Sequence, residues 1–168
     1  MEIRIFYDVC ATSPNEWGGW KLHSFNRRHR SFKDPSFLQD TNGNLQIGWR
    51  RKFAVGTAFI LSYYEHSGCF WTLTGEGPSC LFDSVATAGC LEWIGPGKLP
   101  SGYAEREKCA RAFLKTYTAW ANGHVFVVEC GEDSCGDVYD VEEHIETLIG
   151  PDWRSTCGAG NDLAKHLF

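Results

Sequence analysis

The sequence predicts an α+β fold in a single domain, residues 1–168, with a mostly antiparallel sheet, one main helix at about 104–121 and a short acidic helix at about 140–148. Short apolar and aromatic segments separated by turn residues favour antiparallel strands. Apolar residues at helical spacing favour the two helices. A length of 168 residues with 43% hydrophobic residues is typical of one globular domain.

Strands are predicted in the first half of the chain on both sides of a segment with many turn residues. Residues 2–9 alternate apolar and polar side chains, as a strand with one buried face does. Residues 55–64 are apolar, β-branched and aromatic, and residues 69–74 are expected to pair with them in a hairpin. Residues 13–52 are expected to form long loops with one or two short elements, one of them near 22–30. The breaks are Pro14, Gly18-Gly19, Pro35 and Asn42-Gly43-Asn44.

In the second half, a further strand is expected at 89–94 before the main helix. Ser101 is expected to cap the start of this helix, because a side-chain oxygen there satisfies a free N–H of the first turn. Asn122-Gly123 supplies the left-handed conformation that ends many helices. Residues 124–130 then predict another strand.

Charge is strongly polarised along the chain beneath a formal net charge of −5. Residues 129–152 carry nine acids and no Lys or Arg, whereas residues 21–52 carry eight bases and two acids. Such a distribution favours charged partners, because summed charge steers encounters even where no single pair is strong. The bases are Lys21, Arg27, Arg28, Arg30, Lys33, Arg50, Arg51 and Lys52, and the acids are Glu129, Glu132, Asp133, Asp137, Asp140, Glu142, Glu143, Glu146 and Asp152.

The short helix lies inside this acidic segment. Asp140 is expected to be its N-cap, with an acid at the third helical position, and Gly150-Pro151 to end it. Its apolar residues Val141, Ile145 and Leu148 are expected to face the core. The carboxylates of Glu142, Glu143 and Glu146 would then form a row that faces the solvent.

The chain begins without a basic region followed by an apolar run, and no stretch approaches the ~18 apolar residues of a membrane span. We therefore expect a cytoplasmic protein that does not associate with membranes. The eight Cys residues are then expected to be mostly free thiols, because the cytoplasm keeps thiols reduced.

Several segments together resemble a family of small proteins common in bacteriophages and mobile elements. They are EIRIFYD and SPNEW near the start, then YEHSG, PSCLFDS, YTAWANGHVFVVE and EDSCGDVY, and the resemblance spans roughly residues 2–139. This chain has Gly136-Asp137-Val138-Tyr139 after Cys135, where the family usually has an aromatic residue next to the Cys. The resemblance implies a phage-type accessory protein of the kind that acts on host machinery or neutralises restriction and CRISPR defence. It carries no activity over to any residue.

One enzyme hypothesis centres on His66, Cys80 and Asp83, which lie within eighteen residues of one another. In this chemistry a thiolate attacks, an imidazole takes its proton and a carboxylate orients the ring. The alternative is structural: a buried Cys80, a turn His66 that bonds to the backbone, and Asp83-Ser84 at the start of a turn.

A structural zinc site is a weaker hypothesis. Cys130 and Cys135 are spaced almost as zinc ligands are, with His124, His144 or Cys157 as possible further ligands. No second close pair accompanies them, and Cys130 would equally end the predicted strand as a core residue. The sequence otherwise predicts no cofactor.

The basic residues Arg27–Arg30 suggest a third hypothesis, a binder of single-stranded nucleic acid. Trp20, Phe25 and Phe32 lie close by in sequence, and single strands favour this mixture of phosphate contacts and stacking surfaces. The pI of about 5.6 is far below that of typical nucleic-acid-binding domains. The alternative is a basic loop that pairs with the acidic segment.

The function favoured by the sequence is stoichiometric binding to a host protein, such as a defence nuclease, through the acidic face. A row of carboxylates competes with DNA for a basic groove, speeds association and makes binding sensitive to salt. The expected binding residues are Glu132, Asp133, Asp137, Asp140, Glu142, Glu143 and Glu146, with Trp17, Trp20 or Trp153 as aromatic anchors.

Overall fold

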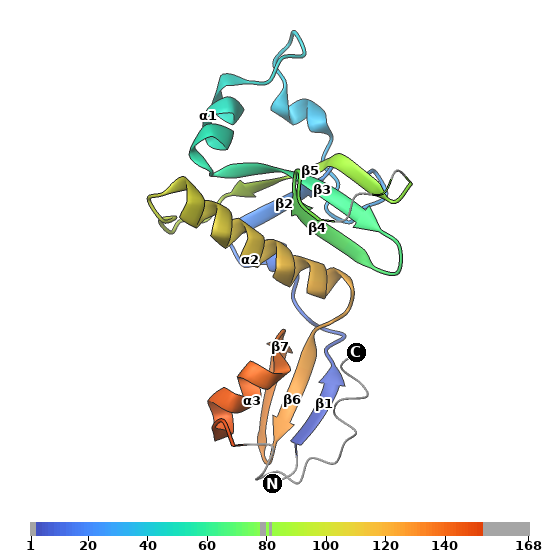
Figure 1. The fold of residues 1–168 in the computed structure, drawn as a ribbon, viewed down its shortest axis with the longest axis vertical. Helices are drawn as coiled ribbons and strands as arrows, with labels where there is room; N and C mark the ends of the chain where they lie inside the picture. The colour runs from blue at the N-terminus through green and yellow to red at the C-terminus, as the bar shows by residue number, and fades with distance from the viewer. Residues whose placement is uncertain (1–2, 78–79, 81, 153–168) are drawn as a thin grey trace. The chain divides into compact units, whose positions relative to one another are not determined.

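The computed structural model describes residues 3–77, 80 and 82–152, and they form two compact units (Figure 1). The terminal unit joins residues before Ser13 to residues after Asn122, and the central unit is Ser13–Asn122. Each unit has its own antiparallel sheet and its own helix packed on it, so the α+β class is confirmed. That the chain is one domain stays a prediction.

The central unit is built on a four-stranded sheet in the order β2-β5-β3-β4, with every pair antiparallel. The strands are β2 Trp20–Ser24, β3 Ala58–Glu65, β4 Cys69–Leu73 and β5 Ser84–Trp93. The helices are α1 Ile47–Val55 and α2 Tyr103–Ala121, with short 3-10 helices at Pro14–Glu16 and Pro35–Leu38.

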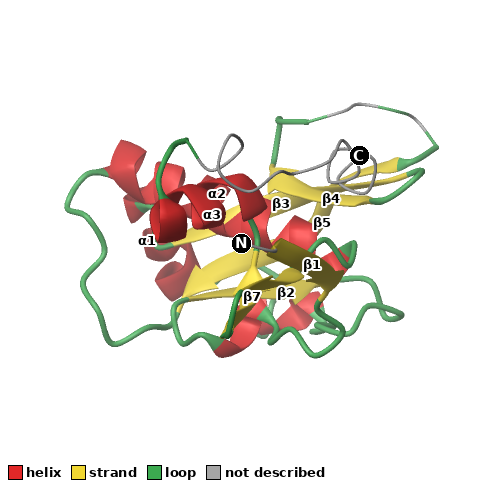
Figure 2. Ribbon diagram, turned by 90° about the horizontal axis from the view of Figure 1, so that it is seen from below, coloured by secondary structure: helices red, strands yellow, loops and turns green. Residues whose placement is uncertain are grey.

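Helices cover both faces of this sheet (Figures 1 and 2). On one face, Ala110, Leu114 and Tyr117 of α2 pack against apolar side chains from all four strands. On the other face, Trp49 of α1 packs against Ala58 and Cys90, together with Leu38. Because both faces are covered, the strands have consecutive apolar residues and not strict alternation.

The C-terminal end of α2 also protects the free edge of β4. The backbone N–H of Trp71 donates to Thr118 Oγ1 at 3.1 Å, and that of Cys69 donates to Asn122 Oδ1 at 2.8 Å. Asn122 Nδ2 returns a hydrogen bond to the Cys69 carbonyl at 2.8 Å. Side chains of the helix thus replace the partner that an edge strand lacks, and this protects the edge from pairing with another chain.

A close approach at Gly89 brings β2, β5 and the Trp71 ring together. Gly89 lies opposite Ser24 in the β2–β5 register. A Cβ atom on Gly89 would lie 2.6 Å from the carbonyl oxygen of His23 and 3.1 Å from the ring of Trp71. Only glycine therefore fits here, and the aromatic ring packs directly on the backbone of β5.

A partly buried ionic network joins α1 to the sheet. Glu92 of β5 is 3.3 Å from Nε2 of His23 and forms an ion pair with Lys52 of α1, whose ammonium lies over the Trp49 ring. Burial, followed by the charge of Lys33, holds the pKa of His23 below its ordinary value, although the hydrogen bond with Glu92 acts in the opposite direction. The imidazole is therefore kept mostly neutral at pH 7.

The terminal unit is a three-stranded sheet in the order β1-β6-β7, with α3 packed on it. Its elements are β1 Ile3–Tyr7, β6 Phe126–Cys130, β7 Asp133–Val138 and α3 Val141–Ile149. Val141 and Ile145 are buried against Val128 and Val138, as expected for the apolar face of α3. Leu148 was expected there too, but this is wrong: it is 49% exposed, and Ile149 packs on the cluster in its place.

Several predicted elements agree with the structure and others need correction. The main helix, the β3–β4 hairpin and the opening strand are confirmed. The Ser101 cap is wrong, because Gly102 is the N-cap and no side chain caps α2. Val55 ends α1 and does not begin β3, since Gly56 at φ +74° stops the helix there. The elements α1 and β7 were not predicted, and the short element expected near 22–30 is the strand β2, which ends at Ser24.

We predict that Gly89→Ala destabilises the central unit by about 1–3 kcal/mol, because its methyl group would overlap a backbone carbonyl that cannot move aside. Urea unfolding followed by Trp fluorescence measures this, since six of the seven Trp residues lie in the central unit. Gly48→Ala on α1 is the matched control, because a Cβ there meets nothing within 4 Å. The prediction fails if both variants unfold at the same urea concentration as the wild type.

We also predict that the central unit loses stability as the pH falls from about 7.5 to about 5. The lowered pKa of His23 means that the folded state favours the neutral ring. Its stabilising contribution is therefore complete above the unfolded pKa of about 6.5 and is lost as the pH falls below it. His23→Gln should reduce this pH dependence. Equal urea midpoints at the two pH values for the wild type would contradict the prediction.

Candidate functional site

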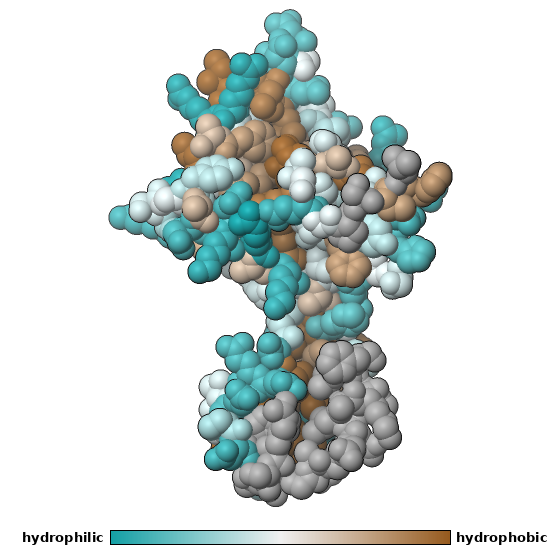
Figure 3. Space-filling model, in the orientation of Figure 1, coloured by the Kyte–Doolittle hydropathy of each residue, from teal (hydrophilic) through white to brown (hydrophobic). Residues whose placement is uncertain are grey.

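The acidic surface expected from the sequence lies on one unit. In its described part, the terminal unit carries ten carboxylates and a single base, Arg4. All seven acidic residues predicted to bind a partner are exposed, on β7, on α3 and in the turns beside them. The space-filling view shows a hydrophilic surface over α3 (Figure 3). The charge division in the sequence therefore coincides with the division of the structure into units.

Asp137 and Asp140, which belong to the seven acids, also form hydrogen bonds within the terminal unit. Asp137, at φ +55°, accepts a hydrogen bond from the Thr12 backbone N–H at 3.1 Å, and its own N–H donates to Asp8. Asp140 is the N-cap of α3 and accepts from the Glu143 backbone N–H at 3.0 Å, as predicted. Among the described residues, Glu132, Glu143 and Glu146 form no ion pair, so their carboxylates remain available to a partner.

The aromatic anchors differ in exposure. Trp17 is half exposed, whereas Trp20 is buried in the core beside Phe59 and Trp93. Trp20 is therefore excluded as an anchor. Trp153 lies outside the described residues.

The structure brings His66, Cys80 and Asp83 together at the turns that follow β3 and precede β5. Asp83 Oδ2 lies 3.5 Å from His66 Nδ1 and 3.5 Å from Cys80 Sγ. The carboxylate, and not the imidazole, therefore faces the thiol. A nucleophilic triad needs the imidazole between the other two groups, to take the thiol proton.

No metal centre is formed by the described residues. They contain no group of three or more His, Cys, Asp or Glu side chains arranged to hold an ion. Cys130 and Cys135 lie on neighbouring strands, where Cys135 is paired with Val128 and Cys130 with Asp133. Cys157 lies outside the described residues.

The basic residues Arg27–Arg30 form a tight loop after β2. Asn26 Oδ1 accepts from the Arg28 backbone N–H at 3.0 Å, and His29 Nδ1 accepts from the Ser31 backbone N–H at 3.0 Å. Ser31 Oγ lies 2.9 Å from the Tyr117 hydroxyl of α2, which fixes the far end of the loop. Arg30 lies over the ring of Trp120, whereas Arg27 and Arg28 are exposed with no ion pair in the described structure.

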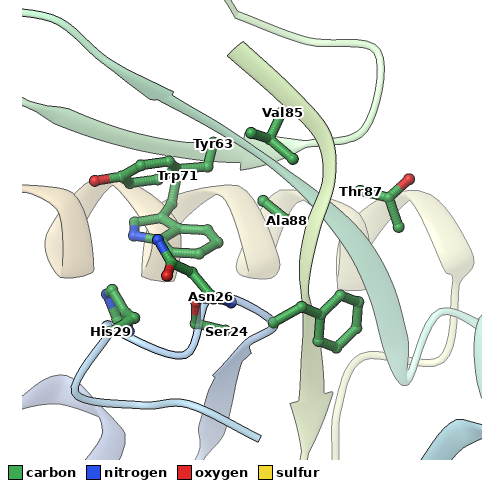
Figure 4. A pocket seen from close by; sticks show the side chains of 9 residues that line it. Ser24, Asn26, His29, Tyr63, Trp71, Val85, Thr87 and Ala88 are labelled. Carbon is green, nitrogen blue, oxygen red and sulfur yellow. Dashed lines mark hydrogen bonds between the residues drawn. The ribbon is translucent and has the colours of Figure 1, made fainter. Parts of the chain in front are cut away.

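The sequence did not predict a pocket beside this loop (Figure 4). Its volume is about 230 Å³, and it is lined by Ser24, Phe25, Asn26, His29, Tyr63, Trp71, Val85, Thr87 and Ala88. The Trp71 ring contacts Tyr63 at a centroid distance of 4.7 Å and His29 at 5.3 Å. These rings come from three separate segments, so no local spacing in the sequence indicates the pocket. Of the aromatic residues that the sequence suggested for stacking, Phe25 lines the pocket but Trp20 does not.

Polar groups in the pocket wall include an unsatisfied donor. The Trp71 indole Nε1 is fully buried with no acceptor among the described residues. Burial lowers the pKa of His29, so its ring is mostly neutral at pH 7. Because Nδ1 accepts a hydrogen bond, the proton of the neutral ring lies on Nε2.

Comparison of the chain with protein families, with curated proteins and with solved structures finds no match. None of the helices in the described part is sufficiently long and apolar to cross a bilayer.

Proposed function

We propose that this chain is a phage-type accessory protein that binds stoichiometrically to a host protein in the host cytoplasm. The acidic surface of the terminal unit is the binding surface. The partner is a nuclease of a defence system, of the restriction or CRISPR type, or the complex that contains it. The observation that carries the proposal is the ratio of ten carboxylates to one base in the described part of that unit.

The physical argument is electrostatic. A small unit with this charge has a negative field over its surface, which accelerates encounter with a basic groove. Exposed carboxylates of β7 and α3 occupy such a groove in place of DNA phosphates. Because the groove evolved to hold a polyanion, the contact needs no catalytic residue, only exposed negative charge on a folded scaffold. The sequence resemblance to phage and mobile-element proteins supports the same context.

The rival enzyme proposal has weaker support. His66, Cys80 and Asp83 are close together, but Asp83 stands between the other two. In this arrangement the imidazole is not next to the thiol. Among the described residues, the only group beside the thiol that could act as its base is the Asp83 carboxylate.

The first experiment is a pull-down from nuclease-treated bacterial lysate with the tagged full chain. It is run at about 0.1 M and at about 1 M salt, between which the Debye length falls from about 10 Å to about 3 Å. The expected result is one DNA-binding protein, captured in stoichiometric amount at low salt and released at high salt, whose DNA binding the chain inhibits. Capture that is insensitive to salt, or a captured protein that still binds DNA in the complex, would contradict the proposal.

We predict that Glu143→Gln with Glu146→Gln weakens binding to the captured protein roughly five- to thirty-fold, since each exposed ion pair contributes up to about 1 kcal/mol. Both residues are exposed and neither caps α3, so the helix should remain folded, as circular dichroism would verify.

The matched control for this pair is Glu16→Gln with Glu105→Gln, which makes the same change of net charge on exposed residues of the central unit. Binding of this control should stay close to that of the wild type. Equal weakening by both pairs would show that only the total charge matters, and would remove α3 from the binding surface.

A further inference from the structure

We infer that the pocket of the central unit binds a single unstacked nucleobase, with the attached phosphate contacted by Arg27 and Arg28. The inference goes beyond the proposed function, because it concerns the other unit and a ligand of opposite charge. The ligand class is a nucleotide, either free or as an unpaired position of a single strand.

The size and walls of the pocket suit a planar ring. Its volume of about 230 Å³ exceeds the roughly 150 Å³ that suffices to hold benzene in an engineered protein cavity. His29, Tyr63 and Trp71 supply aromatic surface from three different segments (Figure 4). Bases stack on such side chains whatever their sequence, because every base has a π face.

The polar groups of the pocket favour a ring with acceptor atoms. Two N–H donors of residues that line the pocket have no acceptor among the described residues: the Asn26 amide and His29 Nε2. Carbonyl oxygens and ring nitrogens of a nucleobase supply these acceptors, whereas the side chain of a Phe or Leu in a peptide supplies none.

The charge beside the pocket favours a phosphate. Arg27 and Arg28 lie between Asn26 and His29 in the chain, and these two neighbours line the pocket. Neither guanidinium group lies within 4 Å of a carboxylate in the described structure, although the charge of Arg27 helps to lower the pKa of Asp34. The central unit as a whole carries thirteen bases and nine acids. Planar guanidinium groups match the oxygens of a phosphate.

The loop is already held in one conformation, which reduces the entropy that binding must remove. Ser24 Oγ accepts from the Asn26 N–H, the His29 N–H donates to the Asn26 carbonyl, and the Phe32 N–H donates to the His29 carbonyl. Preorganisation of this kind increases affinity without adding contacts.

Calorimetric titration of the full chain tests the inference. The probes are a purine and a pyrimidine 5′-monophosphate, a single-stranded oligonucleotide of about ten nucleotides, and the same sequence as a duplex. Binding of a monophosphate as tight as that of the oligonucleotide identifies a free nucleotide, and preference for the oligonucleotide identifies a single strand. A duplex bound as tightly as the single strand, or no binding of any probe, overturns the inference.

Two sets of variants separate the stacking of the base from the recognition of the phosphate. Tyr63→Leu should weaken binding about tenfold, because a stacking surface is removed, whereas Tyr63→Phe should bind as the wild type does. Arg27→Gln with Arg28→Gln should weaken binding. The plot of the logarithm of the binding constant against the logarithm of the salt concentration should also become shallower, by about 0.7 in slope for each phosphate that is no longer neutralised.

The control for the arginine pair is Arg50→Gln with Arg51→Gln on α1, an equal change of charge on exposed residues outside the pocket. This control should keep the affinity of the wild type. Equal weakening by both arginine pairs would reduce the interaction to nonspecific charge and overturn the inference. The arginine test stands even if Tyr63→Leu proves unstable, because Arg27 and Arg28 are exposed.

Discussion

The central unit depends on the contact between the Trp71 ring and the backbone of β5 at Gly89. Because residue 89 has no side chain, β2 pairs closely with β5 and the indole packs on the backbone of β5. The backbone N–H of Trp71 is held by Thr118 of α2, and its ring meets Tyr63 and His29. One contact thereby joins two edges of the sheet, the main helix and the loop after β2, and it also forms the wall of the pocket.

The basic residues of the central unit divide into those with structural partners and those without. Lys52 pairs with Glu92, Arg111 pairs with Glu76, and Lys33 lies over Phe37. The side chain of Arg106 donates to the carbonyl groups of Pro100 and Val55. Arg27 and Arg28 are exposed and form no ion pair in the described structure. A count of bases along residues 21–52 therefore overstates the positive charge that is available to a ligand. Arg27 and Arg28 belong to the loop whose residues Asn26 and His29 line the pocket, and this location carries more information than the number of bases.

Local patterns were sufficient for much of the fold but not for the pocket. Helical spacing predicted α2, and Asp140 with Glu143 predicted α3, because caps and apolar periodicity are properties of neighbouring residues. In α1 only Trp49 is buried, so the helix has almost no apolar stripe to recognise. In β7 every residue of Asp133–Val138 except Val138 is exposed, so the segment has no apolar face that would indicate a strand. It is a strand because it pairs with β6. His29, Tyr63 and Trp71 meet only after the sheet has formed, so their contact cannot be inferred from spacing.

The net charge of the whole chain limits how the pocket can work. At −5 the far field is negative and repels a polyanion, so long-range steering cannot supply the affinity for a nucleotide. Charges separated by more than about 10 Å are largely screened at about 0.1 M salt, so contacts within the pocket act almost independently of this field. Affinity must then come from stacking, from unsatisfied donors and from the two nearby arginines. A site of this kind favours an unpaired base over a duplex, because a stacked and paired base presents neither its face nor its acceptors.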